Sequence, residues 1–407
     1  MSCASASIRW LPWAVLAAAG CGQTQAAGDA WRVERTTVDG VQIVRSLGGS
    51  TWQRSPQLVE ELTFGVADGA QEYMFGQISY IAPDGRGGAY VLDGQVPVLR
   101  HYDSTGSYTR TIGRAGSGPG EYQSPAMGLA VLSDDRIVLL DPRNARFNVY
   151  SPDGTILQHW PRPSGLFTNR AMYVDTADHI YTRVVAGMMQ PGEPMPPIGL
   201  LRLSPQGETL DTIPAPPFPG EPSGSAGILA PAKIWELHRD GYLVVGVSDR
   251  YAIELRKPEG TIRIEKAAER IPVNQEERAE REAHTAYLTK RSGGRGPALG
   301  PVPGMKPYFQ AFYAGSDGTI WVRLHQAGIR RDRPLGGGTG PDAPPQIAWT
   351  EPIVFDVFEP DGTYLGEVHV PQGTTLHTFS RGRLWATREG EQGEIVVTRL
   401  RLVEPTP

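Results

Sequence analysis

The hydrophobic residues of this chain are gathered in short runs that alternate with tight turns. Runs such as GAYVLD (88–93), RIVLLD (136–141) and TIWVRL (319–324) are rich in Val, Ile, Leu and Tyr, residue types that favour β-strands. Asp-Gly and Pro-Asp-Gly sequences between the runs close hairpins, because Gly accepts a positive φ and Pro fixes the first turn position. The pattern therefore predicts an all-β chain of many short strands.

One set of these turns recurs at a regular interval. Its members are YDSTG (102–106), YSPDG (150–154), LSPQG (203–207), RKPEG (256–260) and FEPDG (358–362). They are spaced by about 50 residues, and by about twice that across the last interval, which contains an insertion. A period near 50 with four strands in each unit is typical of a β-propeller, whereas a β-sandwich with long loops would show no such period.

The number of repeats predicts a six-bladed β-propeller of four-stranded blades over residues 31–403. Five repeats are complete, and the sixth, residues 375–403, lacks an outer strand. We expect the N-terminal segment WRVERTTVDGVQIVRS (31–46) to supply that strand. Pairing the two ends of the chain in one blade closes the ring and leaves no free sheet edge there.

A helical and Gly/Pro-rich insertion, residues 272–310, separates blades four and five. Asn274 is placed to cap a helix over QEERAEREAHTAYLTK (275–290), which has acidic residues in its first turn and basic residues at its end, the order that the helix dipole prefers. Its apolar positions are few, which favours a helix lying on the propeller surface. The next segment, SGGRGPALGPVPGMKP (292–307), is expected to act either as a flap over the central channel or as a disordered loop.

The first 20 residues have the features of a signal peptide. An apolar run from Trp10 to Ala19 follows Arg9 and is too short to span a bilayer. The run ends in Ala-Ala-Gly-Cys, which resembles the lipobox of bacterial lipoproteins, in which the cysteine is lipidated; here that residue is Cys21. The alternative is ordinary cleavage after Ala26 or Ala27.

The predicted organisation is thus a lipoprotein-type signal peptide (1–20), a tether (21–30), one propeller (31–403) and a short tail (404–407). Cys3 and Cys21 are the only cysteines. The mature folded part therefore has no disulfide and no CxxC site.

The segment from Asp84 to Ile156 resembles the NHL-repeat type of six-bladed β-propeller found in exported bacterial proteins. It contains DGRGGAYVLD (84–93) and, between two blades, GRAGSGPGEY (113–122). The resemblance is specific over about two blades and weaker towards residue 403. It implies the propeller fold and an exported location, and in some members of the group a hydrolase or lyase activity.

The glycine-rich run GRAGSGPGEY (113–122) raises the separate possibility of a phosphate-binding loop. Such a loop ends in Gly-Lys-Ser/Thr and precedes a helix, but here Glu121 follows the last glycine. A dinucleotide fingerprint also requires a helix, and a β segment follows instead. We interpret the run as a connection from the outer strand of one blade to the inner strand of the next.

The long connections all fall on one face of the predicted propeller. They are 113–125, 184–198, 213–229, 272–310 and 323–349. Each joins either two blades or the second and third strands of one blade, and in a propeller these connections share a face. Elaborated loops are a common sign of a working surface, although surface loops also tolerate insertion without any function.

Polar side chains at the ends of the second strands are the candidate ligand-binding groups of that face. They are Asp93, Asp141, Arg143, Asn144, Asp249, Arg250, His325 and Arg388. Around a central opening, such residues can converge on one small ligand. Each also has an ordinary structural role open to it: the aspartates can accept backbone N–H groups at turns, the arginines can pair with neighbouring acids, and a lone histidine can be buried or solvated.

The net charge and the motifs exclude some functional classes but do not identify one. The formal net charge is −5, which argues against nucleic-acid binding. No HExxH or GxSxG motif is present. Two classes remain, and the first, favoured one is a binding or scaffold propeller of the periplasm or outer membrane. It would be monomeric and without cofactor, would touch the membrane only through its lipid anchor, and would recognise an envelope protein, a peptide or a glycan.

The second class is a metal-dependent enzyme, either a lactonase-like hydrolase or an NHL-type lyase. It would hold a divalent cation at the channel mouth. Asp141, Asn144 and Asp249 provide suitable ligand types for that ion.

Overall fold

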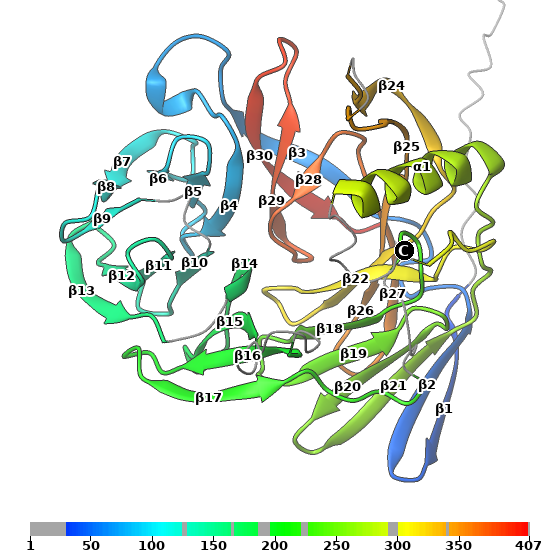
Figure 1. Cartoon of the computed structure of the whole chain (residues 1–407). Coiled ribbons are helices and arrows are strands. Elements are labelled where there is room, and N and C mark those ends of the chain that lie inside the picture. Colours follow the sequence, from blue (N-terminus) through cyan, green and yellow to red (C-terminus); the bar gives the residue numbers. More distant parts are fainter. Residues whose placement is uncertain are drawn as a thin grey trace, which may run out of the picture.

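The chain forms a ring of six β-sheets around a central axis (Figure 1). The structure is a computed structural model that describes residues 30–123, 128–163, 167–185, 196–220, 227–291, 300–338 and 342–405. Each sheet contains a meander of four antiparallel strands, so the predicted six-bladed β-propeller is confirmed. Cys21 and the rest of the predicted signal and tether up to residue 29 lie outside the described residues.

The first three blades are continuous in sequence. Blade 1 consists of β4 (Ile78–Pro83), β5 (Ala89–Asp93), β6 (Val98–Tyr102) and β7 (Tyr108–Ile112). Blade 2 consists of β10 (Gly128–Val131), β11 (Ile137–Asp141), β12 (Arg146–Tyr150) and β13 (Ile156–Pro161). Blade 3 consists of β14 (Phe167–Val174), β15 (Ile180–Val185), β16 (Ile198–Leu203) and β17 (Thr209–Pro214).

The other three blades carry additions. Blade 4 consists of β18 (Lys233–Leu237), β19 (Leu243–Val247), β20 (Ala252–Lys257) and β21 (Gly260–Lys266). Blade 5 consists of β22 (Phe309–Ala314), β23 (Ile320–Leu324), β26 (Ile353–Phe358) and β27 (Tyr364–Val370), with the hairpin β24 (Ile329–Gly336) and β25 (Gln346–Thr350) inserted after β23. Blade 6 consists of β28 (Thr375–Leu376), β29 (Arg383–Glu389), β30 (Ile395–Val403) and β3 (Gln57–Phe64).

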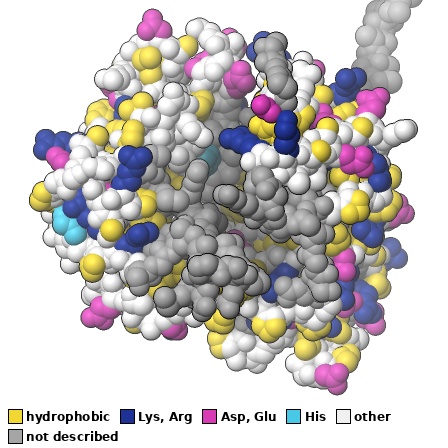
Figure 2. Space-filling view, viewed as in Figure 1, with side chains coloured by type: hydrophobic (Ala, Val, Ile, Leu, Met, Phe, Trp, Pro, Cys, Tyr) yellow, Lys and Arg dark blue, Asp and Glu magenta, His cyan; other side chains and the backbone are white. Residues whose placement is uncertain are grey.

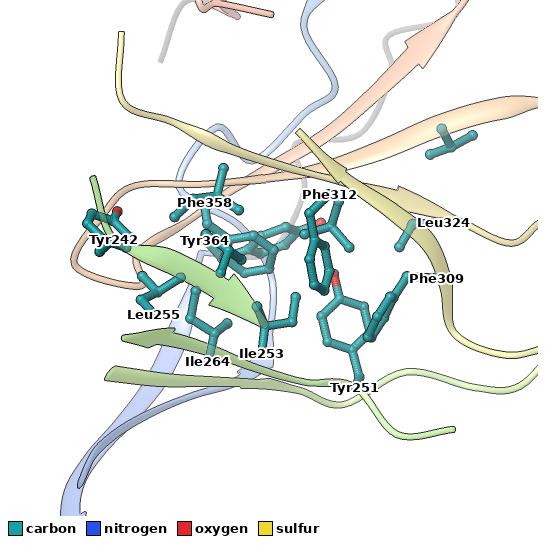
Figure 3. Close-up of a cluster of buried hydrophobic side chains, with 14 residues drawn as sticks. Tyr242, Tyr251, Ile253, Leu255, Ile264, Phe309, Phe312, Leu324, Phe358 and Tyr364 are labelled. Atoms are coloured by element: carbon teal, nitrogen blue, oxygen red, sulfur yellow. The ribbon is translucent and has the colours of Figure 1, made fainter. Parts of the chain in front are cut away.

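The hydrophobic core is divided among the six junctions between neighbouring blades. Each of six clusters of buried side chains draws its members from two adjacent sheets. The cluster between blades 4 and 5 is rich in aromatic residues and includes Tyr251, Phe309 and Tyr364 (Figure 3). The cluster that joins blade 6 to blade 1 contains Trp385 and Tyr102, so the ring is closed by the same apolar packing that holds its other junctions.

The predicted closing strand of blade 6 is wrong in position. Residues 57–64, as β3, pair with β30, whereas residues 31–46 lie at blade 4. There β1 (Arg32–Val38) and β2 (Val41–Gly48) form a hairpin, and β2 runs parallel to β21, which extends the sheet of blade 4 to six strands. The physical reason is the turn Asp39-Gly40, with φ of 50° and 77°. A two-residue Asp-Gly turn pairs its flanking strands with each other.

The segment after this hairpin crosses blade 5 before it reaches blade 6. The backbone N–H groups of Thr51 and Trp52 donate to the carbonyls of Tyr364 and Leu365 on β27, at 3.1 and 2.8 Å. The Trp52 side chain is buried in the cluster between blades 5 and 6. Residues 30–64, which we call the N-terminal arm, therefore contact the outer edges of blades 4, 5 and 6.

The predicted helix is confirmed as α1 (Gln275–Arg291), which lies between blades 4 and 5 (Figure 1). The Asn274 carboxamide oxygen accepts the backbone N–H of Glu277 at 2.8 Å, as expected of a cap. Glu280 accepts the backbone N–H of Ala348 at 2.6 Å, which ties the helix to β25. The following segment, 292–299, lies outside the described residues.

A fully buried lysine anchors this helix to blade 5. The Lys306 ammonium lies 2.7 Å from the carboxylate of Glu277 on α1 and 2.9 Å from that of Glu351. It also donates to the carbonyl of Gln326 at 2.9 Å. Lys306 and Glu277 have no solvent exposure, so their charges must be compensated by protein groups, which for Glu277 include the Arg281 guanidinium at 3.9 Å.

The run GRAGSGPGEY (113–122) connects blade 1 to blade 2, as predicted. It folds back as two short parallel strands, β8 (Arg114–Ala115) and β9 (Glu121–Tyr122). The Glu121 carboxylate binds the Arg114 guanidinium at 2.7 Å and accepts the backbone N–H of Gly118 at 2.8 Å. Glu121, the acidic residue that argues against a phosphate-binding loop, thus stabilises the turn of this connection.

The long connections occur where the sequence analysis placed them. In the observed strand order, each joins two blades or the second and third strands of one blade. We call the side of the ring that carries them the loop-elaborated face. Among the described residues, the one further helical element is a 3-10 turn, η1 (Gln71–Tyr73), ahead of blade 1. None of the helices in the described ranges is both long and apolar enough to cross a membrane.

Candidate functional site

The centre of the ring contains two adjoining cavities, which together form an axial channel. Their volumes are about 660 and 350 Å³. The first strands of blades 3, 4 and 5 line both cavities, and those of blades 1 and 6 also line the larger one. The two cavities share Tyr173, Glu236, Ala311 and Phe312. Cavities of about 300–1,000 Å³ are the size at which proteins hold small ligands.

The two cavities open towards opposite faces of the ring. The larger one is lined by Pro83, Arg239 and Ser316, which lie at turns between first and second strands. The smaller one is lined by Arg183 and Ile198, next to the long second-to-third connection of blade 3 on the loop-elaborated face. The four shared residues therefore lie at the middle of the channel.

A carboxyl group, a guanidinium and a phenol meet at this middle point. Glu236 Oε2 accepts a hydrogen bond from Tyr173 at 3.3 Å and another from Arg183 at 3.4 Å. The Arg183 guanidinium also donates to the Trp235 carbonyl at 2.8 Å and lies 4.4 Å from the centre of the Trp235 ring. The side chains of Glu236 and Arg183 are each only 14% exposed, so the pair is largely withdrawn from water.

Burial changes the acidity of several groups in the channel. It raises the pKa of Glu236 above the ordinary range, although Arg183 opposes this effect. It likewise raises the pKa of Tyr173 and Tyr80. Burial lowers the pKa of His377 to about 4, so this imidazole is neutral at pH 7. Groups with shifted pKa values in a cavity are concentrated at functional sites.

The raised pKa of Glu236 predicts that this residue lowers the stability of the fold. Because the folded-state pKa lies above the unfolded one, its contribution to stability is complete at low pH and is lost as pH rises through the folded pKa. We expect the stability of Glu236→Gln relative to wild type to be higher at pH 7 than at pH 5, because only wild type has a buried carboxyl that must ionise as pH rises. Arg183 keeps its contacts with Trp235 in this variant.

The measurement is chemical denaturation of wild type and Glu236→Gln at pH 7 and at pH 5. The advantage of the variant should shrink at the lower pH. A variant that is less stable at both values, by the same amount, would contradict the assigned acidity.

Sequence reasoning missed this site because it examined the wrong strands. The candidates were taken from the ends of second strands, whereas the first strands line the axis. The available signal was the sequence KIWEL (233–237), in which Glu236 stands between Trp235 and Leu237 inside a short apolar strand. A charged residue at such a position is rarely buried without a partner.

The aspartates at the strand ends have structural contacts. The Asp93 carboxylate accepts four backbone N–H groups of its own turn and the preceding loop, those of Gly76, Gln77, Gln95 and Val96. Asp141 is fully buried and accepts the Asn144 amide at 2.6 Å. The structure thus brings Asp141 and Asn144 together, within one turn of blade 2.

The remaining candidates are dispersed around the ring. Arg143 is exposed on the turn after β11. Asp249 and Arg250 are neighbours, 3.9 Å apart, on the turn after β19, and Arg388 pairs with Glu60 of the N-terminal arm at 3.1 Å. His325 lines a different cavity, between blades 4 and 5.

None of the eight candidates lines the axial channel in the part of the chain that the structure describes. Over the same residues, no group of three or more His, Cys, Asp or Glu side chains is arranged to hold a metal ion.

Comparisons with known proteins support the fold alone. No protein-family model matches the chain, and no curated protein matches it. Among solved structures, a proposed exported protein of Bacteroides fragilis is 10% identical, with a TM-score of 0.47 over 86% of this chain and 95% of that one. A member of the duf4221 family from Bacteroides vulgatus is 12% identical, with a TM-score of 0.44 over 86% and 99%.

An enzyme is also among these similar structures. The PQQ-bound aldose sugar dehydrogenase of Streptomyces coelicolor is 15% identical, with a TM-score of 0.42 over 86% of this chain and 98% of that one. With TM-scores below 0.5, none of these similarities implies a function for this chain.

Proposed function

We propose that this chain is an exported binding or scaffold propeller that takes up a peptide, a glycan or a segment of an envelope protein in its axial channel. The signal-like residues 1–20 and the lipobox-like sequence before Cys21 support export to the periplasm or outer membrane with a lipid anchor. The NHL-like repeats between Asp84 and Ile156 agree with that location.

One observation carries the binding role: the buried Glu236–Arg183 pair at the junction of the two cavities. The stability of the fold is not a sufficient reason for this pair, since a buried ion pair is often no better than apolar packing. A ligand with an apolar part and one or two hydrogen-bonding groups fits the site best. The aromatic walls of the channel, which include Tyr80, Phe312 and Tyr313, would receive the apolar part.

The experiment is a binding screen of mature protein, residues 22–407, against peptide and glycan collections. Ligands found in the screen are then titrated against Ala311→Trp, which fills the junction of the cavities, and Arg183→Met, which removes the guanidinium. We expect a loss of affinity of at least about tenfold in both variants, the effect of one lost buried hydrogen bond to a charged group.

The matched control is Arg202→Met, which breaks an Arg–Asp pair on the outside of blade 3 between Arg202 and Asp211, 2.7 Å apart. This control should bind like wild type. Ligands whose affinity is unchanged in Ala311→Trp would show that the channel is not the binding site.

A catalytic role is the second candidate, and Glu236 is the observation that favours it. A carboxyl group with a raised pKa can donate a proton near neutral pH, which is the property of a general acid. The metal-dependent form of this candidate is tested by metal analysis of wild type, Asp141→Ala and Asp249→Ala after dialysis against calcium, zinc and manganese. About one bound ion, lost in either variant, would favour the enzyme over the binding propeller.

A further inference from the structure

A second cavity lies away from the axis, between blades 4 and 5, and we call it the interblade pocket. Its volume is about 600 Å³, within the range of small-ligand sites. Four parts of the chain line it: residues 46–55 of the N-terminal arm, Tyr251 of blade 4, residues 266–271 from the end of β21 onward, and residues in and around blade 5. The arm passes from β2, on blade 4, to Thr51 and Trp52, which bond to β27 of blade 5, and so covers the junction of these blades.

The floor of the interblade pocket, which we define as Lys266, Asp356, Tyr251 and Tyr364, contains one positive and one negative charge that compensate each other. The Lys266 ammonium lies 2.7 and 2.8 Å from the two oxygens of Asp356 and 3.0 Å from the hydroxyl of Tyr364. The Tyr364 hydroxyl donates to Asp356 at 2.6 Å, and the Tyr251 hydroxyl donates to the same carboxylate. Both tyrosines belong to the aromatic cluster of Figure 3. The hydrogen-bonding capacity of Asp356 is filled, so it does not require a ligand.

His325 differs from the floor because one of its ring nitrogens has no partner. Its Nδ1 lies 3.1 and 3.2 Å from the two oxygens of Glu351. Although burial alone would raise it, hydrogen bonds from His325, the Gln326 backbone and Lys306 hold the pKa of Glu351 at about 2. Glu351 is therefore an ionised acceptor, and Nδ1 carries the hydrogen.

In the tautomer with the hydrogen on Nδ1, the other ring nitrogen of His325, Nε2, is a hydrogen-bond acceptor. The His325 side chain is 10% exposed and lines the pocket. Among the described residues, no hydrogen bond reaches Nε2. Nε2 is therefore available for a hydrogen bond to a ligand or a water molecule in the pocket.

The charges around the pocket disfavour a ligand with a net charge. Lys266 is matched by Asp356, and the two exposed charges at the rim, Arg54 and Glu269, have opposite signs. Glu367 lies 3.8 Å from Lys266 and 3.4 Å from His369, so it is not a free charge either. In the view of Figure 2, acidic and basic side chains are also interspersed across the described surface.

The other lining groups are uncharged and form hydrogen bonds. They are the side chains of Ser46, Ser50, Gln53, Ser55, Tyr308 and Gln326. Hydroxyl and amide groups of this kind both donate and accept, and a partly exposed tyrosine ring offers an apolar surface beside them. This combination matches a molecule that has many hydroxyl groups and no charge.

We propose that the interblade pocket is a second ligand site, separate from the axial channel, that binds a neutral sugar of two or three units. One sugar hydroxyl donates to Nε2 of His325, and others exchange hydrogen bonds with the serine and glutamine side chains of the rim. The Glu351 carboxylate, fixed by Lys306, sets the orientation of the imidazole.

The test is calorimetric titration of mature protein, residues 22–407, with maltose, cellobiose and N,N′-diacetylchitobiose. We expect saturable binding of at least one of them. His325→Ala should weaken that binding by at least about tenfold. Ser55→Trp, which fills the pocket from an exposed position of the arm, should abolish it without touching the histidine, and so covers the case that His325→Ala fails to fold.

Two comparisons make the result decisive. Val96→Trp places the same large side chain at a position of blade 1 that is 55% exposed, and it should bind the sugar like wild type. Glycerol phosphate and an arginine-rich peptide should compete less well than the sugar.

Three results would overturn the proposal: no binding of any of the three sugars, binding that survives Ser55→Trp, or stronger binding of a charged competitor at this pocket. The Ala311→Trp variant of the axial channel should retain sugar binding, so failure at one site is distinguishable from failure at the other.

Discussion

Replacement of Lys306 by methionine is expected to destabilise the folded protein by about 3–5 kcal/mol, the usual cost of removing one partner from a buried ionic network. The variant leaves the carboxylates of Glu277 and Glu351 buried without their ammonium. It also removes the donor to the Gln326 carbonyl. The free energy of unfolding is measured by chemical denaturation, because this quantity tests the network directly.

The control is Lys290→Met on the same helix. Lys290 lies 2.8 Å from Asp342, but both side chains are largely exposed, at 68% and 85%, and exposed pairs contribute little. Its stability should change by less than about 0.5 kcal/mol. If the two variants were equally stable, Lys306 would not anchor the helix. Because Glu351 also orients His325, Lys306→Met should weaken sugar binding at the interblade pocket as well.

A disulfide between Val59 and Arg401, introduced as Val59→Cys/Arg401→Cys, is expected to stabilise the protein by about 2–4 kcal/mol. The two residues are register partners on β3 and β30. Paired Cα atoms in antiparallel strands lie at distances that a disulfide spans. Mature protein, residues 22–407, contains no other cysteine, so the engineered pair has no competitor. Thermal unfolding in the oxidised and reduced forms gives the difference.

The control pair tests whether residues 31–46, and not β3, close blade 6. Thr36 lies on β1, at the edge of blade 4, and Thr36→Cys/Arg401→Cys should remain unlinked under the same oxidising conditions. A cross-link in that variant and none between positions 59 and 401 would show that residues 31–46 close the ring.

The repeat period made the architecture predictable, because each blade obeys the same local rules of strand and turn. The spacing of about 50 residues is set by local sequence. The position of α1 and its cap at Asn274 are also set by local sequence. The closing strand was not predictable in the same way. Both 31–46 and 57–64 can form strands, and only the Asp39-Gly40 turn distinguishes them, by pairing the first segment with itself.

The site was less predictable because it depends on contacts between blades. Nothing near Glu236 in sequence indicates that Arg183 and Tyr173 of the neighbouring blade will meet it. His325 was a candidate from its position at a strand end, but its partner Glu351 lies beyond the inserted β24–β25 hairpin. A single sequence shows which residues end strands, not which face of a blade meets the next.

The closure of blade 6 by β3 has a consequence for the order in which the chain folds. Thr63 on β3 and Thr398 on β30 form a hydrogen bond across a sequence separation of 335 residues. Contacts of such high order form slowly, because the intervening chain must first be closed into a loop. Blade 6 cannot be completed until the last strand, β30, is present.

Until then β3, near the start of the chain, has an unpaired edge. The polypeptide therefore passes through a stage in which five blades have their strands and the ring is still open.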